Sequence, residues 1–304
     1  YIYHTPMFML TLLSRLPLWW LYRLSDLLFL LVYYVARYRR RVVSLNLQRA
    51  FPERSEAERR RIARRFYRFF CDYAVETLKL LTISPDEMKR RMTLQGLPEL
   101  EKALQEQPFV FFMLGHYGNW EWLSSVPLHT STHCMQLYTP LHSAKADRLF
   151  YRMRSRFGAD TVAKNDALRR ILSLKRNGIR TFVGFIADQG PKPVNIHHWI
   201  TFLHQDTPVF TGAERIGKKV GAAAYFLHIT RPRRGYYVCQ FECLTRCMAQ
   251  HPDYEFTDLF MRRLEKEINE QPHLWLWSHR RWKHTRQEVE RIQQGFARHA
   301  EAKN

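Results

Sequence analysis

Cysteine is scarce in this sequence, and its five cysteines form no C-x-x-C pair. Cys239, Cys243 and Cys247 are spaced by four, but no histidine or second cysteine pair completes a zinc pattern. An odd number of cysteines favours reduced thiols in a cytosolic compartment over a disulfide framework. His197 and His198 are adjacent, yet no third ligand stands at a metal-binding spacing, so we expect no metal or other cofactor.

Acidic residues are also few, with 28 Asp and Glu against 48 Lys and Arg and a net charge of +20. Such a surplus indicates an anionic partner, either nucleic acid or an anionic membrane surface. The sequence has no helix-turn-helix, zinc-finger or RNP signature, so charge alone would support nucleic acid. Internal repeats and low-complexity linkers are absent too, and an apolar content of 46% argues against disorder.

The longest apolar segment covers residues 6–35 and is long enough to cross a bilayer. Arg15, Arg23 and Asp26 interrupt it, and charges are costly in mid-membrane, so a helix lying in the interface is an alternative to a spanning one. A buried hairpin of a soluble core is the third alternative. We expect residues 1–36 to form a membrane anchor or an interfacial helix.

Four arginines follow the apolar segment directly: Arg37, Arg39, Arg40 and Arg41. Under the positive-inside rule they place the rest of the chain in the cytoplasm, and they suit anionic lipid headgroups. Ser55 and Glu58 form a capping box that predicts the start of an amphipathic helix rich in arginine, whose charges could also be an ordinary solvated face. We expect residues 37–92 to be a basic helical region.

Short apolar runs alternate with helical stretches in the rest of the chain. The pattern predicts strands at 109–114, 132–139, 181–187, 222–230 and 236–244, and helices at about 143–157, 165–177, 208–218 and 254–270. Such alternation predicts one α/β domain over residues 93–304, with a mostly parallel central sheet flanked by helices.

Two polar clusters directly follow strands of this predicted sheet. Residues 115–121 follow the strand at 109–114, and residues 188–191 follow the strand at 181–187. In open α/β sheets the chemistry sits at the carboxyl ends of the strands. Both clusters are therefore candidates for the same cleft.

His116 and Glu121 are five residues apart in the first cluster. Across a tight turn containing Gly118, the carboxylate could return to the imidazole, fix its tautomer and raise the basicity of the other ring nitrogen. The sequence has no G-x-S-x-G elbow and no obvious protein nucleophile beside the pair. These residues favour a general base that activates a hydroxyl supplied by a substrate, although a histidine at a strand end can also be a satisfied polar residue.

The stretch GHYGNWE at 115–121 resembles the H-x-x-x-x-[DE] signature of the lysophospholipid acyltransferase superfamily. Its residues are most similar to those of the lipid A late (secondary) acyltransferases. The resemblance covers nearly the whole chain and keeps the order of the family's motifs. These are the hydrophobic start, YRRRVVSLNLQRAFPE, ADQGP, TFLHQDTPVFTGAERIGKKVGA and LWLWSHRRWK.

The resemblance implies roles for residues at matching positions. His116 would be the general base, Glu121 its partner, and Asp188 a further site residue that positions the substrate or the catalytic pair. Arginines of RMRSRFG, of which Arg154 and Arg156 are the candidates, would bind phosphate or stabilise charge. Asn119 and Gln189 are the remaining expected substrate contacts. Asp188 could instead be a turn cap, and the arginines a solvated helix face.

Tryptophan and basic residues alternate at 275–283, a pattern that could stack on nucleobases. The run falls where the resembled family carries its tryptophan-rich ending, so we expect core and membrane-facing aromatic residues instead.

The function that the resemblance implies is O-acyl transfer from an acyl thioester, carried by acyl carrier protein, to a hydroxyl of a lipid A precursor. The expected place is the cytoplasmic face of the bacterial inner membrane, with the acyl donor, a lipid acceptor and an anionic membrane surface as partners and no nucleic acid. Two alternatives stay open. One is an acyltransferase for a lysophospholipid or aminoacyl lipid, and the other is a basic, non-catalytic membrane or nucleic-acid binding protein.

Overall fold

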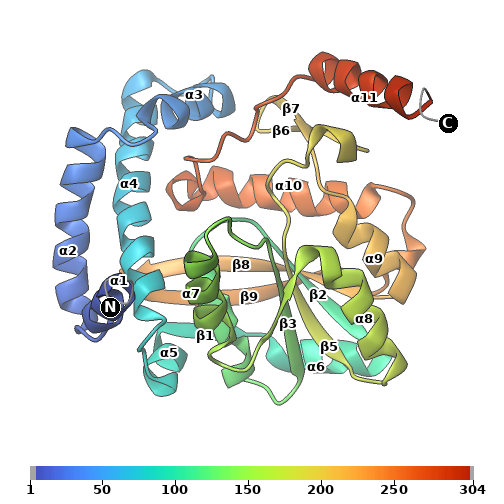
Figure 1. The fold of residues 1–304 in the computed structure, drawn as a ribbon, viewed down its shortest axis with the longest axis horizontal. Coiled ribbons are helices and arrows are strands. Elements are labelled where there is room, and N and C mark those ends of the chain that lie inside the picture. The colour runs from blue at the N-terminus through green and yellow to red at the C-terminus, as the bar shows by residue number, and fades with distance from the viewer. Residues whose placement is uncertain (1–4, 302–304) are drawn as a thin grey trace.

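A seven-stranded sheet of order β1-β9-β8-β2-β5-β3-β4 lies at the centre of the fold (Figure 1). Neighbouring strands pair in parallel except β8 and β9, which are antiparallel. The strands are β1 (Met92–Gln95), β2 (Phe109–Leu114), β3 (His133–Tyr138), β4 (Asp160–Ala163), β5 (Thr181–Ile186), β8 (Ala223–Arg233) and β9 (Tyr236–Thr245). The predicted α/β fold with a mostly parallel sheet is confirmed.

This computed structural model describes residues 5–301, and the side chains of residues 8–296. Residues 1–4 of the predicted anchor and 302–304 of the predicted α/β domain lie outside the described residues. The division of the chain into three regions at residues 36 and 92 stays a prediction.

Helices connect and cover the strands of the sheet (Figure 1). They are α5 (Pro85–Arg91), α6 (Leu97–Glu106), α7 (Ala144–Ser155), α8 (Ala167–Arg176), α9 (Gly212–Val220) and α10 (Glu255–Glu270), whereas α11 (Arg286–Glu301) lies apart from the sheet (Figure 1). The helix predicted at 208–218 begins four residues later than expected, because Pro208 belongs to a strand. The six residues of β2 are all buried, as a strand covered on both faces requires.

A small hairpin outside the main sheet was not predicted. It pairs β6 (Trp199–Phe202) with β7 (Gln205–Pro208) in antiparallel register. Leu203 and His204 form its two-residue turn and both have positive φ, 49° and 60°. Such turns usually carry Asn or Gly, so this sequence gives no hairpin signal.

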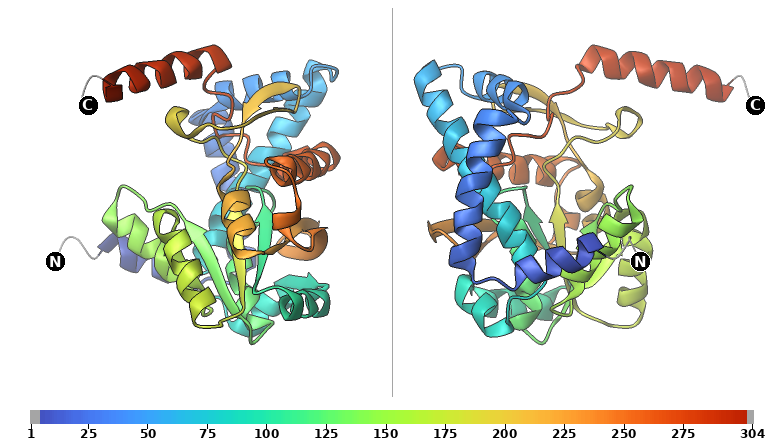
Figure 2. Two further views of the ribbon diagram at one scale, coloured as in Figure 1. Left: turned by 90° about the vertical axis from the view of Figure 1, so that its right-hand side faces the viewer. Right: turned by 60° about the vertical axis from the view of Figure 1, so that its left-hand side comes forward.

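The predicted N-terminal apolar segment forms two helices, α1 (Thr5–Ser14) and α2 (Leu18–Leu30), and α2 continues into the π-helix η1 (Leu31–Val35). At the break between α1 and α2, Lys79 Nζ donates to the carbonyl oxygens of Ser14 and Leu16 at 3.1 and 2.9 Å. One face of α2 packs against α4 (Glu56–Lys79), and the right view of Figure 2 shows the two helices side by side, with α11 projecting on the opposite side.

The other face of the α1–α2 segment is apolar and exposed. Its exposed residues are Phe8, Met9, Leu10, Leu12, Leu16, Trp19, Trp20, Leu27, Leu30, Leu31, Tyr34 and Val35. The stretch Leu18–Val35 has a mean hydropathy of 1.3 and is, by length and composition, able to cross a bilayer. Only 28% of it is buried within the protein, so a fully buried core hairpin does not describe it.

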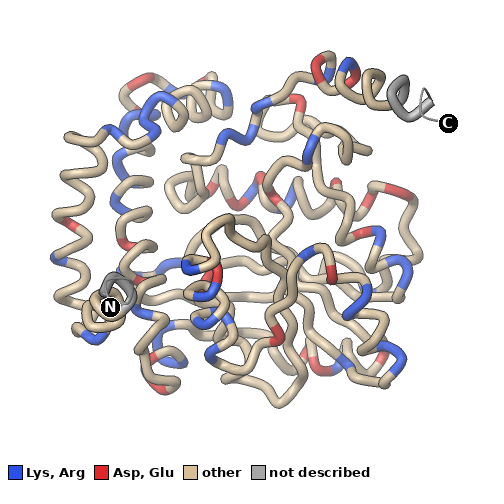
Figure 3. Tube along the Cα trace, in the orientation of Figure 1, with Lys and Arg blue, Asp and Glu red and all other residues tan. Residues whose placement is uncertain are grey.

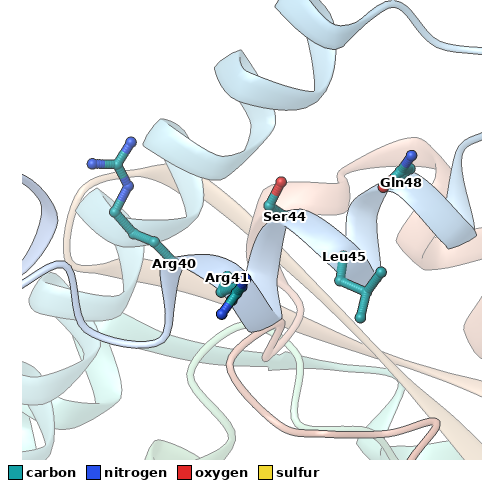
Figure 4. A pocket seen from close by; sticks show the side chains of 5 residues that line it. All are labelled: Arg40, Arg41, Ser44, Leu45 and Gln48. Carbon is teal, nitrogen blue, oxygen red and sulfur yellow. The ribbon is translucent and has the colours of Figure 1, made fainter.

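The region directly after η1 is helical and rich in arginine. It consists of α3 (Arg40–Ala50) and α4, whose N-terminus has the predicted capping box between Ser55 and Glu58. Figure 3 shows Lys and Arg gathered along α3 and the adjoining part of α4. A shallow pocket of about 510 Å³ lies on the outer side of α3, where Arg40, Arg41, Ser44, Leu45 and Gln48 line it (Figure 4).

Candidate active site

The two predicted polar clusters meet at one edge of the sheet. β2 and β5 are parallel neighbours, and the amide of Ala187 extends their pairing by donating to Leu114 O at 3.1 Å. The chain beyond each strand therefore leaves the sheet at the same place. His116 follows β2 and Asp188 follows β5, and their side chains are in contact.

Asp188 is the carboxylate partner of His116. Its Oδ1 lies 2.6 Å from His116 Nδ1, and its Oδ2 accepts from the His116 amide at 2.9 Å and from Trp275 Nε1 at 2.8 Å. The carboxyl group is buried, which by itself raises its pKa, but the charge of His116 and these hydrogen bonds outweigh burial and hold the pKa at about 2. Asp188 is thus an ionised group that fixes the orientation of the imidazole.

Gly115 leaves the space that this contact needs. A Cβ at this position would stand 3.2 Å from Asp188 Oδ2 and 2.8 Å from a methyl carbon of Leu264 on α10. A larger residue would push the carboxylate or the α10 side chain away from the strand end. Glycine therefore permits the close approach of β2, Asp188 and α10.

The second ring nitrogen of His116, Nε2, contacts Gln189. The imidazole side chain is 20% exposed, and its Nε2 lies 3.2 Å from Gln189 Nε2. Trp120 meets the ring edge-on, with centroids 5.1 Å apart and planes at 72°. With Nδ1 turned toward Asp188, Nε2 is the ring nitrogen that Asp188 leaves unbound, and Gln189 lies beside it.

The tryptophan-rich C-terminal segment completes the site. Tyr117 and Trp275 form an isolated antiparallel bridge, in which the Leu276 amide donates to His116 O and the Gly118 amide donates to Leu274 O, both at 3.1 Å. Sequence reasoning missed Trp275 as a site residue, because its partner Asp188 lies 87 positions away. Its buried ring agrees with the expected core role. The Gly118 amide is therefore already hydrogen-bonded.

Glu121 does not pair with His116, in contrast to the expected contact. It forms a two-point ion pair with Arg154 of α7, with Arg154 Nε–Oε2 at 2.9 Å and Nη2–Oε1 at 2.6 Å. The chain enters the 3-10 helix η2 (Trp120–Leu128) here, and this helix directs the Glu121 side chain toward α7. Arg154, expected to bind phosphate or stabilise charge, therefore has a protein carboxylate as its partner.

Asn119 and Arg156, also expected to contact substrate, make structural contacts. Asn119 is fully buried, donates to Glu76 Oε2 at 2.7 Å and caps η2 by accepting from the Trp122 amide. Arg156 Nη1 donates to the carbonyl oxygens of Leu80 and Ile83, which follow α4. In the described structure neither the Arg156 guanidinium nor the Asn119 amide contacts His116. Both side chains instead hold neighbouring elements together.

Two further basic residues from the C-terminal segment surround Asp188. Burial lowers the pKa of His279 to about 4, and nearby Arg281 and His116 add to this, while Asp188 opposes it. Burial also lowers the pKa of Arg281 to about 10 against the attraction of Asp188. Arg281 Nη2 donates to Pro208 O at 2.7 Å, whereas its Nε and Nη1 have no partner within the described part of the chain. Arg281 therefore carries a positive charge near the Asp188 carboxylate, whereas His279 is neutral at neutral pH.

His197 and His198 lie away from this cluster. His197 is exposed, and His198 pairs with Asp258 at 2.7 Å while its ring stacks on Tyr254 at 4.5 Å. Within residues 5–301 no group of three or more His, Cys, Asp or Glu side chains could hold a metal ion. His198 and Asp258 thus form another His–Asp pair, which lacks the tryptophan and glutamine neighbours of the His116–Asp188 pair.

Known proteins with similar sequences share one description. The chain is 26% identical over 157 residues to the lipid A biosynthesis myristoyltransferase of Escherichia coli (strain K12), a match covering 50% of this chain and 47% of that protein. It is 25% identical over 248 residues to the lipid A biosynthesis palmitoleoyltransferase of the same organism, covering 81% and 79%. The lipid A biosynthesis acyltransferase 1 of Shigella flexneri matches at 26% identity over 157 residues, again 47% of its length.

The matched part of the chain therefore spans about half the length of the myristoyltransferase and of acyltransferase 1. A family model covers far more of it: residues 1–284 match the family described as bacterial lipid A biosynthesis acyltransferase. This agrees with the motif order that runs from the apolar start to the tryptophan-rich segment. The chain belongs to the bacterial lipid A biosynthesis acyltransferase family.

Proposed function

We propose that this protein is an O-acyltransferase that moves a fatty acyl group from an acyl thioester, carried by acyl carrier protein, to a hydroxyl of a lipid A precursor. The observation that carries the proposal is the His116–Asp188 pair. A buried, ionised carboxylate holds one ring nitrogen, and the imidazole side chain is 20% exposed. This arrangement suits a general base acting on a substrate hydroxyl.

The reaction needs one base and no covalent enzyme intermediate. His116 Nε2 takes the proton of the acceptor hydroxyl while that oxygen forms a bond to the thioester carbonyl carbon. The tetrahedral oxyanion then collapses, the C–S bond breaks, and the sulfur leaves with the proton that His116 returns. Asp188 stabilises the imidazolium between these two proton transfers.

Gln189 is our candidate donor to the oxyanion. Its amide nitrogen lies 3.2 Å from His116 Nε2, beside the place where the reacting atoms meet. A donor that is already in place before charge develops costs little reorganisation, and losing such a donor typically reduces turnover about 10²–10³-fold. Glu121 and Arg154 would act indirectly, because their ion pair fixes η2 against α7.

The apolar face of α1 and α2 supports a place on the cytoplasmic face of the inner membrane. Exposed Leu, Phe and Trp side chains of this kind suit a lipid-facing helix, and Trp19 and Trp20 suit the headgroup zone. The exposed charges of Arg15, Arg23 and Asp26 favour a helix that lies in the interface. The basic α3, which follows immediately and exposes Arg41, would meet anionic headgroups. The same positive charge suits an acidic acyl carrier protein.

A transfer assay tests the proposed chemistry. Labelled acyl chain on acyl carrier protein would be offered with a lipid A precursor to wild type, His116→Ala and His198→Ala in detergent. His198 is a matched control, because it has its own carboxylate partner but lies outside the site. We expect wild type and His198→Ala to acylate the precursor, and His116→Ala to lose activity by about 10²–10⁴-fold.

The other outcomes separate the parts of the proposal. Transfer that survives in His116→Ala would remove His116 as the base. Transfer to a lysophospholipid or aminoacyl lipid but not to the precursor would reassign the acceptor. Failure of wild type on the whole lipid panel, together with salt-sensitive binding to nucleic acid or vesicles, would favour a non-catalytic protein. Ping-pong kinetics with an isolable acyl-enzyme would contradict the one-step mechanism.

A vesicle flotation experiment tests the membrane face. Wild type should float with vesicles containing anionic lipid, and Trp19→Ser/Trp20→Ser should float less, because both side chains are more than half exposed. Tyr151→Ser removes an aromatic side chain that is also exposed but lies on α7, and it should float like wild type. Equal flotation of the tryptophan variant would show that this face does not bind lipid.

A further inference from the structure

Glu76 of α4 is a completely buried carboxylate outside the His116–Asp188 pair. Three side chains donate hydrogen bonds to it: Tyr22 Oη at 2.9 Å, Asn119 Nδ2 at 2.7 Å and Tyr237 Oη at 2.7 Å. Arg231 approaches it at 3.8 Å. A buried charge is costly unless such partners satisfy it, so this carboxylate and its donors form one interdependent unit.

One of these donors, Asn119, belongs to the loop of residues 116–121, which carries the proposed base His116. Its Nδ2 binds Glu76, while its Oδ1 accepts from the Trp122 amide and so starts η2. The Trp122 indole also donates to the backbone carbonyl of Glu76 at 3.0 Å. Glu76 therefore holds the loop between His116 and Glu121 at its midpoint, through both its side chain and its backbone.

A second contact between α4 and the loop lies beside the base itself. Tyr73, one turn before Glu76, packs against Trp120 with ring centroids 4.2 Å apart. Trp120 in turn meets the edge of the His116 ring. A shift of the loop away from Glu76 would move Trp120, and with it the space beside the imidazole.

The other two donors to Glu76 come from two different elements of the fold. Tyr22 lies on α2, the apolar N-terminal helix, and Tyr237 lies on β9. A neighbouring carboxylate, Asp72, repeats this connection by accepting from Ser25 of α2 at 2.7 Å and from Arg234 at 2.5 Å. Figure 1 shows α4 between α2 and the sheet, so its carboxylates can bind both.

From these contacts we infer that Glu76 is a positioning residue for the proposed acyl transfer, which fixes the loop of residues 116–121 against α4 and connects it to α2. The inference rests on the proposed function. Glu76 touches neither base nor substrate in this role. It acts through Asn119, by keeping Trp120 and His116 in the geometry that the reaction needs, where a small misplacement of groups can cost about 10²-fold in rate.

The test compares Glu76→Gln, Tyr237→Phe and Asn119→Ser with the control Tyr67→Phe. Tyr67 is also fully buried on α4, and its hydroxyl donates to Tyr38 O at 2.6 Å, away from the loop. Three quantities are measured: kcat and KM of acyl transfer, thermal stability, and amide hydrogen exchange of residues 116–122. The exchange measurement does not depend on any substrate.

In Glu76→Gln, Tyr237→Phe and Asn119→Ser, which we call the loop variants, we expect faster amide exchange at residues 116–122. We also expect their kcat to fall about 10- to 100-fold with a smaller change in KM. The combination of Glu76→Gln with Asn119→Ser should cost little more than either change alone, since both break the same connection. Tyr67→Phe should lower stability without changing loop exchange or kcat.

Two results would overturn the inference. One is loop exchange that stays at the wild-type level in Tyr237→Phe and Asn119→Ser. The other is a kcat loss that simply follows stability, as large in Tyr67→Phe as in the loop variants. If wild type transfers no acyl group at all, the proposed function fails, and the exchange data alone still decide whether Glu76 holds the loop.

Discussion

His116 Nδ1 lies 2.6 Å from Asp188 Oδ1, although 72 residues separate the two positions in the chain. Parallel pairing of β2 with β5 brings them together, and Asp188 accepts further hydrogen bonds from the His116 amide and from Trp275. The acidic residue of the H-x-x-x-x-E stretch, Glu121, neutralises Arg154 instead. The two carboxylates therefore have separate tasks, which substitutions can distinguish.

Replacing Asp188 with Asn should cost most of the activity while the substrates still bind. An amide cannot stabilise the imidazolium or hold the same tautomer, and in a comparable triad this change lowers kcat about 10⁴-fold. Steady-state acyl transfer would show a large fall in kcat with a modest change in KM. Asp258→Asn, which alters the carboxylate beside His198, should leave both constants unchanged. Equal losses in the two variants would contradict the assignment.

Trp275→Phe should lower kcat about tenfold, since it removes one hydrogen bond to a charged group, worth about 1.5–3 kcal/mol, and keeps most of the ring. The loss of this donor should also raise the pKa of Asp188 from its depressed value. Trp277→Phe is the matched control, because that indole donates to Pro272 O in the same segment. If Trp277→Phe is as slow as Trp275→Phe, packing rather than the Asp188 contact explains the effect.

Breaking the Glu121–Arg154 pair should be costly for stability. Arg154→Met leaves the buried Glu121 carboxylate without its partner, and such changes typically cost about 3–5 kcal/mol. The double variant Glu121→Gln/Arg154→Met should be more stable than Arg154→Met alone, because no unpaired charge remains. Urea unfolding measures both. Arg169→Met, which breaks an exposed pair with Asp166, should cost less than about 1 kcal/mol.

Stability should fall with acid in a way that depends on Asp188. Its folded-state pKa of about 2 lies below the usual 3.8, so its contribution is complete above pH 4 and is lost as the pH falls toward 2. The difference corresponds to about 2 kcal/mol. Urea unfolding at pH 5 and pH 3 should therefore show a smaller pH effect in Asp188→Asn than in wild type. An equal slope in both proteins would show that other carboxylates control acid unfolding.

The sequence predicts most of this fold because its signals are local. The apolar run of β2 identifies a buried strand, and the turn from strand to polar residues identifies the two clusters at 115–121 and 188–191. Their meeting at one edge then follows from parallel pairing. The hairpin of β6 and β7 lacked the residues that normally mark its turn, and it was missed for that reason.

Side-chain partners were harder to predict than strands. A separation of five residues between His116 and Glu121 is compatible with contact, but the 3-10 helix η2 turns Glu121 toward α7. Trp275 and Glu76 meet the same loop from distant parts of the chain, and no local pattern reports such contacts. Sequence reasoning thus found both ends of the His116–Asp188 pair but assigned His116 the wrong neighbour.

The bridge between Tyr117 and Trp275 also makes the site dependent on a segment that is synthesised after the whole sheet. All seven strands of the sheet precede Trp275 in the chain. Until Trp275 and Leu276 are added, Asp188 lacks its indole donor and the His116 carbonyl lacks the amide that donates to it. A nascent chain can therefore build its sheet before these contacts hold the His116–Asp188 pair in place.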